Sequence, residues 1–212
     1  MLGKREQDVR NGFELPSHLK MENMARYMSV KTSLKSDKES ALAEYARDHK
    51  QNEIGWDIIP YIKRVSGLKV FAKGIMCAED AVLAIEHGAD GIYVSNHGAR
   101  QLDTTPATID VLPEVVQAVR RLDKHIPIYF DGGVRTGADV LKALAIGADC
   151  VYVGRPILWG LATDGQEGVE RVLEILNQEL KEAMLATGCM SVSQARGNPH
   201  LLYDKREYLF KL

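Results

Sequence analysis

A histidine and an arginine stand close together directly after a short apolar run. The run 91–94 has the composition of a buried β-strand, and residues 95–101 continue it as Ser-Asn-His-Gly-Ala-Arg-Gln. His97 offers a group that exchanges a proton near neutral pH, and Arg100 offers a guanidinium that binds a carboxylate through two hydrogen bonds. Small residues between them are typical of a loop that carries function. The segment therefore predicts an acid-base group beside a carboxylate anchor.

Two further charged residues end apolar runs of the same kind. Lys73 closes one run, and we expect its ammonium to point into the mouth at the carboxyl edge of the sheet, where His97 also lies. Asp131 closes another run, and the only cation in its own loop is Arg135. This aspartate either binds a cofactor hydroxyl or caps a turn, and the sequence leaves both interpretations open.

Two glycine-rich loops indicate a phosphate site. Gly132, Gly133 and Gly154 remove side chains from loops that follow strands, so backbone N–H groups can approach a phosphate closely. Arg135 and Arg155 add positive charge next to these glycines. Turn-forming glycines with solvated arginines are the alternative, but consecutive βα loops are a recurrent phosphate location in barrels.

Short apolar strands alternate with amphipathic helices from residue 68 onward, which predicts βαβ units and a parallel sheet. The expected strands are 68–73, 91–95, 127–131 and 150–154. The expected helices are 37–49, 57–65, 78–87, 108–122, 137–146, a short one after Pro156, and 165–186. Segments 78–94 and 137–153 resemble each other at an offset of 59 residues, the distance from Gly88 to Gly147. Each copy consists of a helix, a glycine and a Tyr-Val strand.

Four βα units in a row fit either a doubly wound sheet or a (β/α)8 barrel, and the positions of the polar residues favour the barrel. They follow the carboxyl ends of the strands, where a barrel collects its active site, and the chain has no GxGxxG dinucleotide motif. We therefore predict the α/β class and a (β/α)8 TIM barrel, represented by only its C-terminal four βα units and a C-terminal helix. A complete barrel usually needs about 250 residues. The expectation is that another half completes it or that its first half is absent.

We expect one partial domain over residues 1–212. Within it, residues 1–53 form a loop and a flexible helical excursion, 54–164 form the half-barrel units, and 165–212 form the C-terminal helix and tail. The 27 basic and 29 acidic side chains give a net charge of −2, which argues against nucleic acid or membrane partners. The three cysteines have no metal-binding spacing, so we expect no metal site and an intracellular protein.

These motifs together resemble the FMN-dependent 2-hydroxy acid oxidase and dehydrogenase family. The resemblance rests on the segments Lys73-Gly74, Ser95 to Asp103, Asp131 to Arg135 and Gly154-Arg155-Pro156, in this order and spacing. It implies FMN as the cofactor and His97 as the active-site base. It also implies that Arg100 and Arg5 bind the substrate carboxylate. The cofactor-binding residues that it implies are Lys73 beside flavin N1 and O2, Ser95 at the ring, and Asp131, Gly132, Gly133, Val134, Arg135, Gly154 and Arg155 at the ribityl phosphate.

The implied reaction is the oxidation of a small L-2-hydroxy acid to a 2-oxo acid, with molecular oxygen as acceptor and hydrogen peroxide as product. Two alternatives stay open: a dehydrogenase that uses a cytochrome acceptor, and a truncated, inactive half-barrel that retains only the FMN phosphate site. The aspartate that pairs with the family histidine belongs to the first half of the barrel, so we expect this chain alone to be weak or inactive. The resemblance further implies a homotetramer. The tail ends Phe210-Lys211-Leu212, which differs from a peroxisomal Ser-Lys-Leu signal in its first residue. Family members in animals and plants are peroxisomal, so the resemblance favours the peroxisome over the cytoplasm.

Overall fold

The computed structural model describes residues 10–12, 16–19, 22, 54–122 and 125–203. The predicted helix 37–49, Arg5 and the C-terminal tripeptide lie outside these residues. The chain divides into two compact units. The first unit comprises residues 1–54 and 100–103, and its described part includes a turn in which the Leu19 N–H donates to the Pro16 carbonyl at 2.8 Å. The second unit comprises residues 55–99 and 104–212. A single domain over residues 1–212 stays a prediction.

The second unit is built on a parallel four-stranded sheet with the order β1-β2-β3-β4. Its strands are β1 (Phe71–Ile75), β2 (Gly91–Val94), β3 (Ile128–Phe130) and β4 (Cys150–Val151). Neighbours in the sheet are therefore also neighbours in the sequence, as in consecutive units of a barrel. The predicted parallel pairing of these four segments is confirmed.

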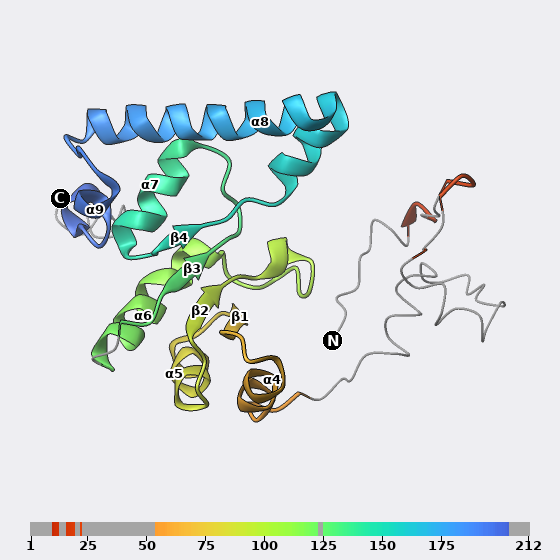
Figure 1. Ribbon diagram of the computed structural model, residues 1–212. Coiled ribbons are helices and arrows are strands. Elements are labelled where there is room, and N and C mark those ends of the chain that lie inside the picture. Colours follow the sequence, from red (N-terminus) through yellow and green to blue (C-terminus); the bar gives the residue numbers. More distant parts are fainter. Residues whose placement is uncertain (1–9, 13–15, 20–21, 23–53, 123–124, 204–212) are drawn as a thin grey trace. The chain divides into compact units, whose positions relative to one another are not determined.

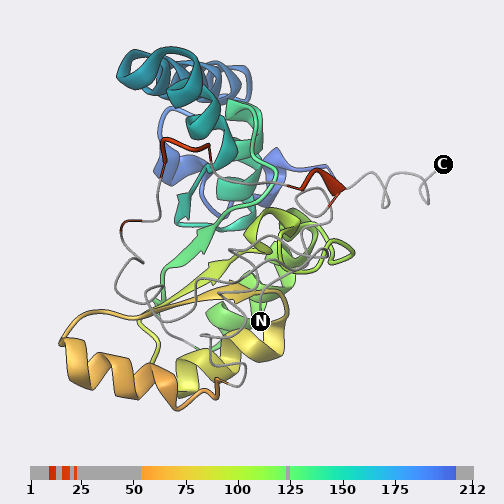
Figure 2. The same cartoon turned by 90° about the vertical axis from the view of Figure 1, so that its right-hand side faces the viewer.

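Helices precede, connect and follow the strands. They are α4 (Ile58–Ser66), α5 (Ala78–Glu86), α6 (Thr108–Arg121), α7 (Gly137–Ile146), α8 (Arg155–Ala186) and the short α9 (Val192–Ala195), with 3-10 turns η2 (His97–Ala99) and η3 (Pro199–Leu201). Helices α5, α6 and α7 line one face of the sheet, and α8 packs against α7 (Figures 1 and 2). Strands β1, β2 and β3 are thus each followed by a helix on this face, and β4 is followed by α8, which makes four βα units.

The period-two alternation of the strands decides what each face of the sheet carries. Ile92, Val94, Ile128 and Phe130 are at most 1% exposed and form the centre of the core under the helices. Tyr93, between two of these core residues, projects from the opposite face. The core therefore lies between sheet and helices, and the other face holds polar and aromatic side chains.

Strand β1 begins later than the sequence predicts. The expected strand started at Leu68, but Leu68 is 70% exposed and the N–H of Val70 donates to Asp90 Oδ2 at 2.8 Å instead of joining a ladder. The strand runs from Phe71 to Ile75, with an irregularity in its pairing between Lys73 and Ile75. Lys73 therefore lies within the strand and not at its end. Its side chain is 42% exposed.

The internal repeat is a repeat in three dimensions as well. Asp90 and Asp149 are 59 residues apart, and each carboxylate accepts a backbone N–H at 2.8 Å, from Val70 just before β1 and from Ile128 at the start of β3. Each also pairs with a basic residue on an earlier helix. The glycines that follow the repeat helices, at positions 88 and 147, both have positive φ, a conformation for which glycine is favoured after a helix.

Helix α8 consists of two arms. Asp164 and Gly165 have non-helical backbone angles, so the arms correspond to the short helix predicted after Pro156 and the helix predicted over 165–186. Gly160 and Gly168 face each other across the bend, where a side chain on either would collide with the other's backbone. In the described part of the chain, no helix is both long and apolar enough to cross a membrane.

Candidate functional site

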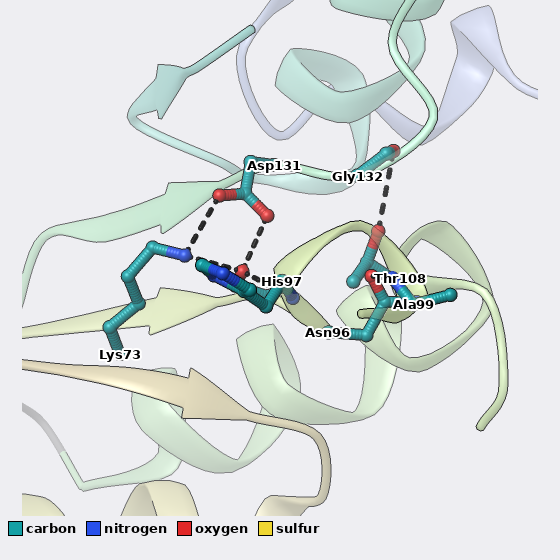
Figure 3. Close-up of polar contacts among 8 residues, drawn as sticks. Lys73, Asn96, His97, Ala99, Thr108, Asp131 and Gly132 are labelled. Carbon is teal, nitrogen blue, oxygen red and sulfur yellow. Dashed lines mark hydrogen bonds and ion pairs between the residues drawn. The ribbon is translucent and has the colours of Figure 1, made fainter. Parts of the chain in front are cut away.

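The buried hydroxyl of Ser95 is the centre of the polar network at the carboxyl end of the sheet. Ser95 follows β2 directly and is 1% exposed. Its Oγ accepts hydrogen bonds from Lys73 Nζ at 2.8 Å and from the backbone N–H of His97 at 3.1 Å, and it donates to Asp131 Oδ1. Figure 3 shows Lys73, His97 and Asp131 converging on this point. The structure therefore joins three of the predicted site residues through one side chain.

The ammonium of Lys73 has two further neighbours. Its Nζ lies 3.1 Å from Asp131 Oδ2, and it sits over the ring of Tyr93 at 4.7 Å from the ring centroid. The sequence pointed to a cation for Asp131 only in its own loop, so this pair was missed. A signal was present in the sequence, because both residues close apolar runs that predict strands of the same parallel sheet.

Four aromatic side chains on strands or just after them lie next to this network, and none of them was among the predicted site residues. Tyr93 contacts the rings of Tyr129 and Tyr152 with centroids 6.0 and 5.1 Å apart, and Phe71 stacks on Tyr129 at 4.6 Å. Gly91 pairs with Phe71 in the sheet, and a side chain there would collide with the phenyl ring. A glycine on β2 thus lets rings from β1 and β3 meet.

The phenol of Tyr93 stays neutral over a wide pH range. Burial raises its pKa well above the ordinary value, and the negative charge of Asp131 raises it further. Burial also raises the pKa of Tyr152. The aromatic group therefore presents uncharged rings and hydroxyls to the lysine and the aspartate.

The loop that carries His97 has an unusual backbone. His97 and Ala99 have φ of 56° and 59°, and Gly98 between them has φ of 67°. Non-glycine residues rarely adopt this left-handed conformation, and such strain is concentrated at functional sites. The side chain of Asn96 helps to hold the turn, because its Oδ1 accepts the Ala99 N–H at 3.2 Å. His97 itself is exposed.

Arg155 ties this loop to the end of β4. Its Nη2 donates to the carbonyl oxygen of Gly98 at 2.8 Å. A side chain on Gly98 would come within 2.7 Å of the same guanidinium nitrogen. Two predicted site segments that are more than 50 residues apart in sequence therefore touch directly, and the guanidinium of Arg155 supports the histidine loop.

The Asp131 to Arg135 loop provides backbone donors. Gly132 and Gly133 have φ of 109° and 73°, and a side chain on Gly132 would collide with Thr108. Within the described residues, no hydrogen bond uses the N–H groups of these two glycines. Val134, also predicted to bind the cofactor, is 4% exposed, so only its backbone is available to a ligand.

The backbone of Arg135 has a different use, because its N–H donates to Asp139 Oδ2 at 3.1 Å. Asp139 belongs to the capping box that Thr136 forms at the start of α7. The guanidinium of Arg135 stacks over Trp159 at 4.9 Å and lines a cavity of about 490 Å³ between the arms of α8. The backbone N–H groups of this loop that are available to a ligand therefore precede the arginine.

The remaining predicted residues lie elsewhere. Gly154 precedes α8 and has φ of −111°, and a Cβ at this position would meet no heavy atom within 4 Å, so the helix N-terminus there is open. Arg100 is exposed and belongs to the first unit, and Arg5 lies outside the described residues. Among the described residues, no group of three or more histidine, cysteine or acidic side chains is arranged to hold a metal.

Comparison with known proteins identifies the family. Residues 1–202 match the family described as FMN-dependent dehydrogenase. This chain belongs to that family. It is 50% identical over 192 residues to 2-hydroxyacid oxidase 1 of Homo sapiens, covering 90% of this chain and 51% of that protein. It is 44% identical over 203 residues to glycolate oxidase 3 of Oryza sativa, covering 96% of this chain and 54% of that protein.

A solved structure of mandelate oxidase with (S)-2-phenylpropionate gives a TM-score of 0.73 at 40% identity, over 93% of this chain and 51% of that one. The chain therefore spans about half the length of the relatives it matches. The predicted family, the partial (β/α)8 barrel and FMN as the family cofactor are confirmed.

The residues present fit the phosphate end of FMN and one edge of its ring. Gly132 and Gly133 supply side-chain-free backbone with N–H groups not used by the described residues, and Gly154 opens the N-terminus of a long helix. Lys73 supplies a fixed cation, which suits a group that gains negative charge on reduction.

Proposed function

We propose that this chain takes part in the FMN-dependent oxidation of a small L-2-hydroxy acid to a 2-oxo acid, with oxygen as acceptor and hydrogen peroxide as product. The observation that carries the proposal is the network of Lys73, Ser95 and Asp131, with the loop of His97 attached to it. Membership of the FMN-dependent dehydrogenase family supports it. Relatives named 2-hydroxyacid oxidase and glycolate oxidase support the substrate class.

Each residue has a role in this proposal. FMN, when bound, would supply the two-electron acceptor of the oxidation. His97 would take a proton from the substrate, while Arg100 and Arg5 would hold the substrate carboxylate. Lys73 would stabilise negative charge at the flavin N1 and O2 edge, and Ser95 would contact the ring. The N–H groups of residues 132–133 and 154–155 would hold the phosphate.

The strained histidine loop suits a general base. Its left-handed backbone is fixed by Asn96 and by the guanidinium of Arg155, so the imidazole of His97 has a defined starting point. A base held in this way does not have to be ordered when substrate arrives. The substitution His97→Asn tests this role, because asparagine tolerates the left-handed region and removes the imidazole.

The experiment is anaerobic reduction of the purified full chain after loading with FMN. The oxidase proposal predicts bleaching of the flavin absorbance by glycolate or L-lactate, at the low rate expected of half a barrel, and hydrogen peroxide on admission of oxygen. His97→Asn should slow the bleaching about 10²- to 10⁴-fold and leave FMN affinity unchanged. Flavin that binds but does not bleach with any L-2-hydroxy acid would exclude the oxidase. Bleaching that persists in oxygen but is reversed by a cytochrome would favour the dehydrogenase.

A second candidate is binding of FMN through the phosphate loops without turnover. It is favoured by the distribution of the predicted residues. Lys73 and both glycine loops belong to the second unit, whereas Arg100 belongs to the first unit and Arg5 lies outside the described residues. The same anaerobic reduction separates the two candidates, because binding without bleaching supports the second.

Location and assembly are also proposals. We propose that the protein resides in the peroxisome rather than the cytoplasm and forms a homotetramer, without nucleic acid or membrane partners. Both rest on the family resemblance. Imaging of the chain with its C-terminus unmodified tests the first, and light scattering of the purified chain tests the second.

A further inference from the structure

The carboxylate of Asp131 binds two other side chains of the candidate site. Its two carboxylate oxygens are divided between two partners, with Oδ2 3.1 Å from Lys73 Nζ and Oδ1 accepting the Ser95 hydroxyl. Its side chain is 20% exposed. The phenol of Tyr93 lies close enough for the carboxylate to raise its pKa. Both oxygens are thus already engaged within the protein.

The contacts of Asp131 converge on the ammonium of Lys73. A lysine side chain has a long flexible stem, so a fixed position costs conformational entropy and needs several partners. Lys73 has three: the Asp131 carboxylate, Ser95 Oγ at 2.8 Å, and the Tyr93 ring at 4.7 Å. These partners come from β2 and the end of β3, while the lysine itself is on β1. The ammonium is therefore fixed across three strands.

The orientation of the Ser95 hydroxyl depends on the Asp131 carboxylate. Its hydroxyl donates to Asp131 and accepts from Lys73 Nζ and from the His97 N–H. Loss of the carboxylate would leave this hydroxyl free to rotate. The second contact of Lys73 would then weaken together with the first.

We propose that Asp131 is a positioning residue for Lys73, which holds the ammonium at the carboxyl edge of the sheet directly and through Ser95. The proposal rests on the proposed function in one respect only, namely that this edge receives FMN. The position of Lys73 is a property of the chain without cofactor. The two ideas can therefore fail separately.

Lys63 is a matched internal reference for the test. Its side chain is 41% exposed, against 42% for Lys73, and it is paired with Asp90 at 2.8 Å in the same unit. Both lysines are thus half-exposed and paired with an aspartate. General loosening of the fold would expose both, whereas a local change would expose one.

The experiment measures the rate at which an acylating reagent modifies each lysine in the folded, cofactor-free chain, with peptide mass spectrometry as readout. Asp131→Asn should raise the rate at Lys73 about five- to tenfold, which is the effect of losing roughly 1 to 1.4 kcal/mol of a half-exposed charged contact, and leave Lys63 unchanged. Asp90→Asn should do the reverse. Asp131→Glu, which keeps the charge, should restore part of the protection. An unchanged rate at Lys73, or an equal rise at both lysines, would overturn the proposal.

A second measurement tests whether the position of the Lys73 ammonium affects the affinity for FMN. FMN fluorescence titration of the full chain should give a dissociation constant about tenfold higher for Asp131→Asn than for the unmodified chain, and an unchanged one for Asp110→Asn, an exposed aspartate on α6. If the unmodified chain binds no FMN while the acylation result holds, the proposed function fails and the positioning role stands. An FMN affinity that Asp131→Asn leaves unchanged would limit the role of the aspartate to the cofactor-free chain and overturn its relevance to the site.

Discussion

Three consecutive residues of the histidine loop share a backbone conformation that only glycine adopts without cost. His97, Gly98 and Ala99 all have φ between 56° and 67°. The left-handed region costs an L-residue roughly 1 to 2 kcal/mol. The loop keeps this strain because Asn96 and Arg155 hold it from two sides. The strain at Ala99 has no chemical purpose of its own, since its side chain is a methyl group.

Ala99→Gly should therefore stabilise the protein. The substitution removes the left-handed penalty, while the extra freedom of glycine in the unfolded chain costs about 0.4 to 1 kcal/mol. We expect the free energy of unfolding to rise by about 0.5 to 1 kcal/mol in urea denaturation. Ala118→Gly within α6 is the control and should lower stability by about 1 kcal/mol. A loss of stability in Ala99→Gly would show that the loop is not strained.

Tyr93 gives the site a pH dependence at the alkaline end. Its pKa in the folded protein is raised by burial and then by Asp131, so the unfolded chain loses the phenol proton first as pH rises. Stability from this group is full below the ordinary tyrosine value of about 10 and declines as pH rises above it. Urea denaturation at pH 7 and pH 10.5 should show a larger loss for the unmodified chain than for Tyr93→Phe. Equal losses would contradict the buried, neutral phenol.

At the scale of elements, the repeated aspartates link each unit to the next. Asp90 bonds to Lys63 and to the N–H of Val70, and Asp149 makes the equivalent bonds to Arg120 and to the N–H of Ile128. Asp149 has an additional partner in Arg196 at 2.8 Å. These contacts lie at the amino ends of the strands, opposite the candidate site. In barrels that end serves stability and the carboxyl end serves catalysis.

Asp90→Ala should cost about 1 to 3 kcal/mol of unfolding free energy, because it leaves the Val70 N–H and the Lys63 ammonium without their acceptor. Asp149→Ala should cost more, since it loses two arginine contacts. Hydrogen bonding to Lys63, and next to Val70, lowers the pKa of Asp90, so its contribution is present above about pH 4 and is lost as pH falls through the folded value. Denaturation at pH 7 and pH 3 checks both statements. A difference between Asp90→Ala and the unmodified chain that is equal at the two pH values would contradict the linkage.

At the scale of the whole molecule, the helices, strands and repeat could be predicted from the sequence, whereas the side-chain contacts between strands could not. The βα units and the repeat were predictable because alternating strands and amphipathic helices leave a periodic trace. The start of β1 was not, because Val70 satisfies its N–H with the Asp90 side chain instead of a strand. The Lys73 and Asp131 pair joins residues 58 positions apart, and only the register of the intervening strand brings them together. Local patterns predict which residues end strands, but partners across a sheet depend on its register.

The two glycine-rich loops lead to a prediction about how much bound FMN stabilises the second unit against unfolding. Gly132 and Gly133 after β3 and Gly154 after β4 have backbone that a phosphate could approach. In the proposed function they would hold the phosphate of FMN, whereas Lys73 and Ser95 would contact its ring. FMN at 100 times its dissociation constant should raise the free energy of unfolding by about 2.7 kcal/mol. We expect the phosphate to supply most of that affinity.

Riboflavin, which lacks the phosphate, should then stabilise the chain far less at the same concentration. Gly132→Ala should abolish the difference between the two ligands, because the new methyl group collides with Thr108 and displaces the loop. Urea denaturation with each ligand measures this directly. Equal stabilisation by riboflavin and FMN would place the affinity at the ring, around Lys73, and remove the phosphate role from the glycine loops.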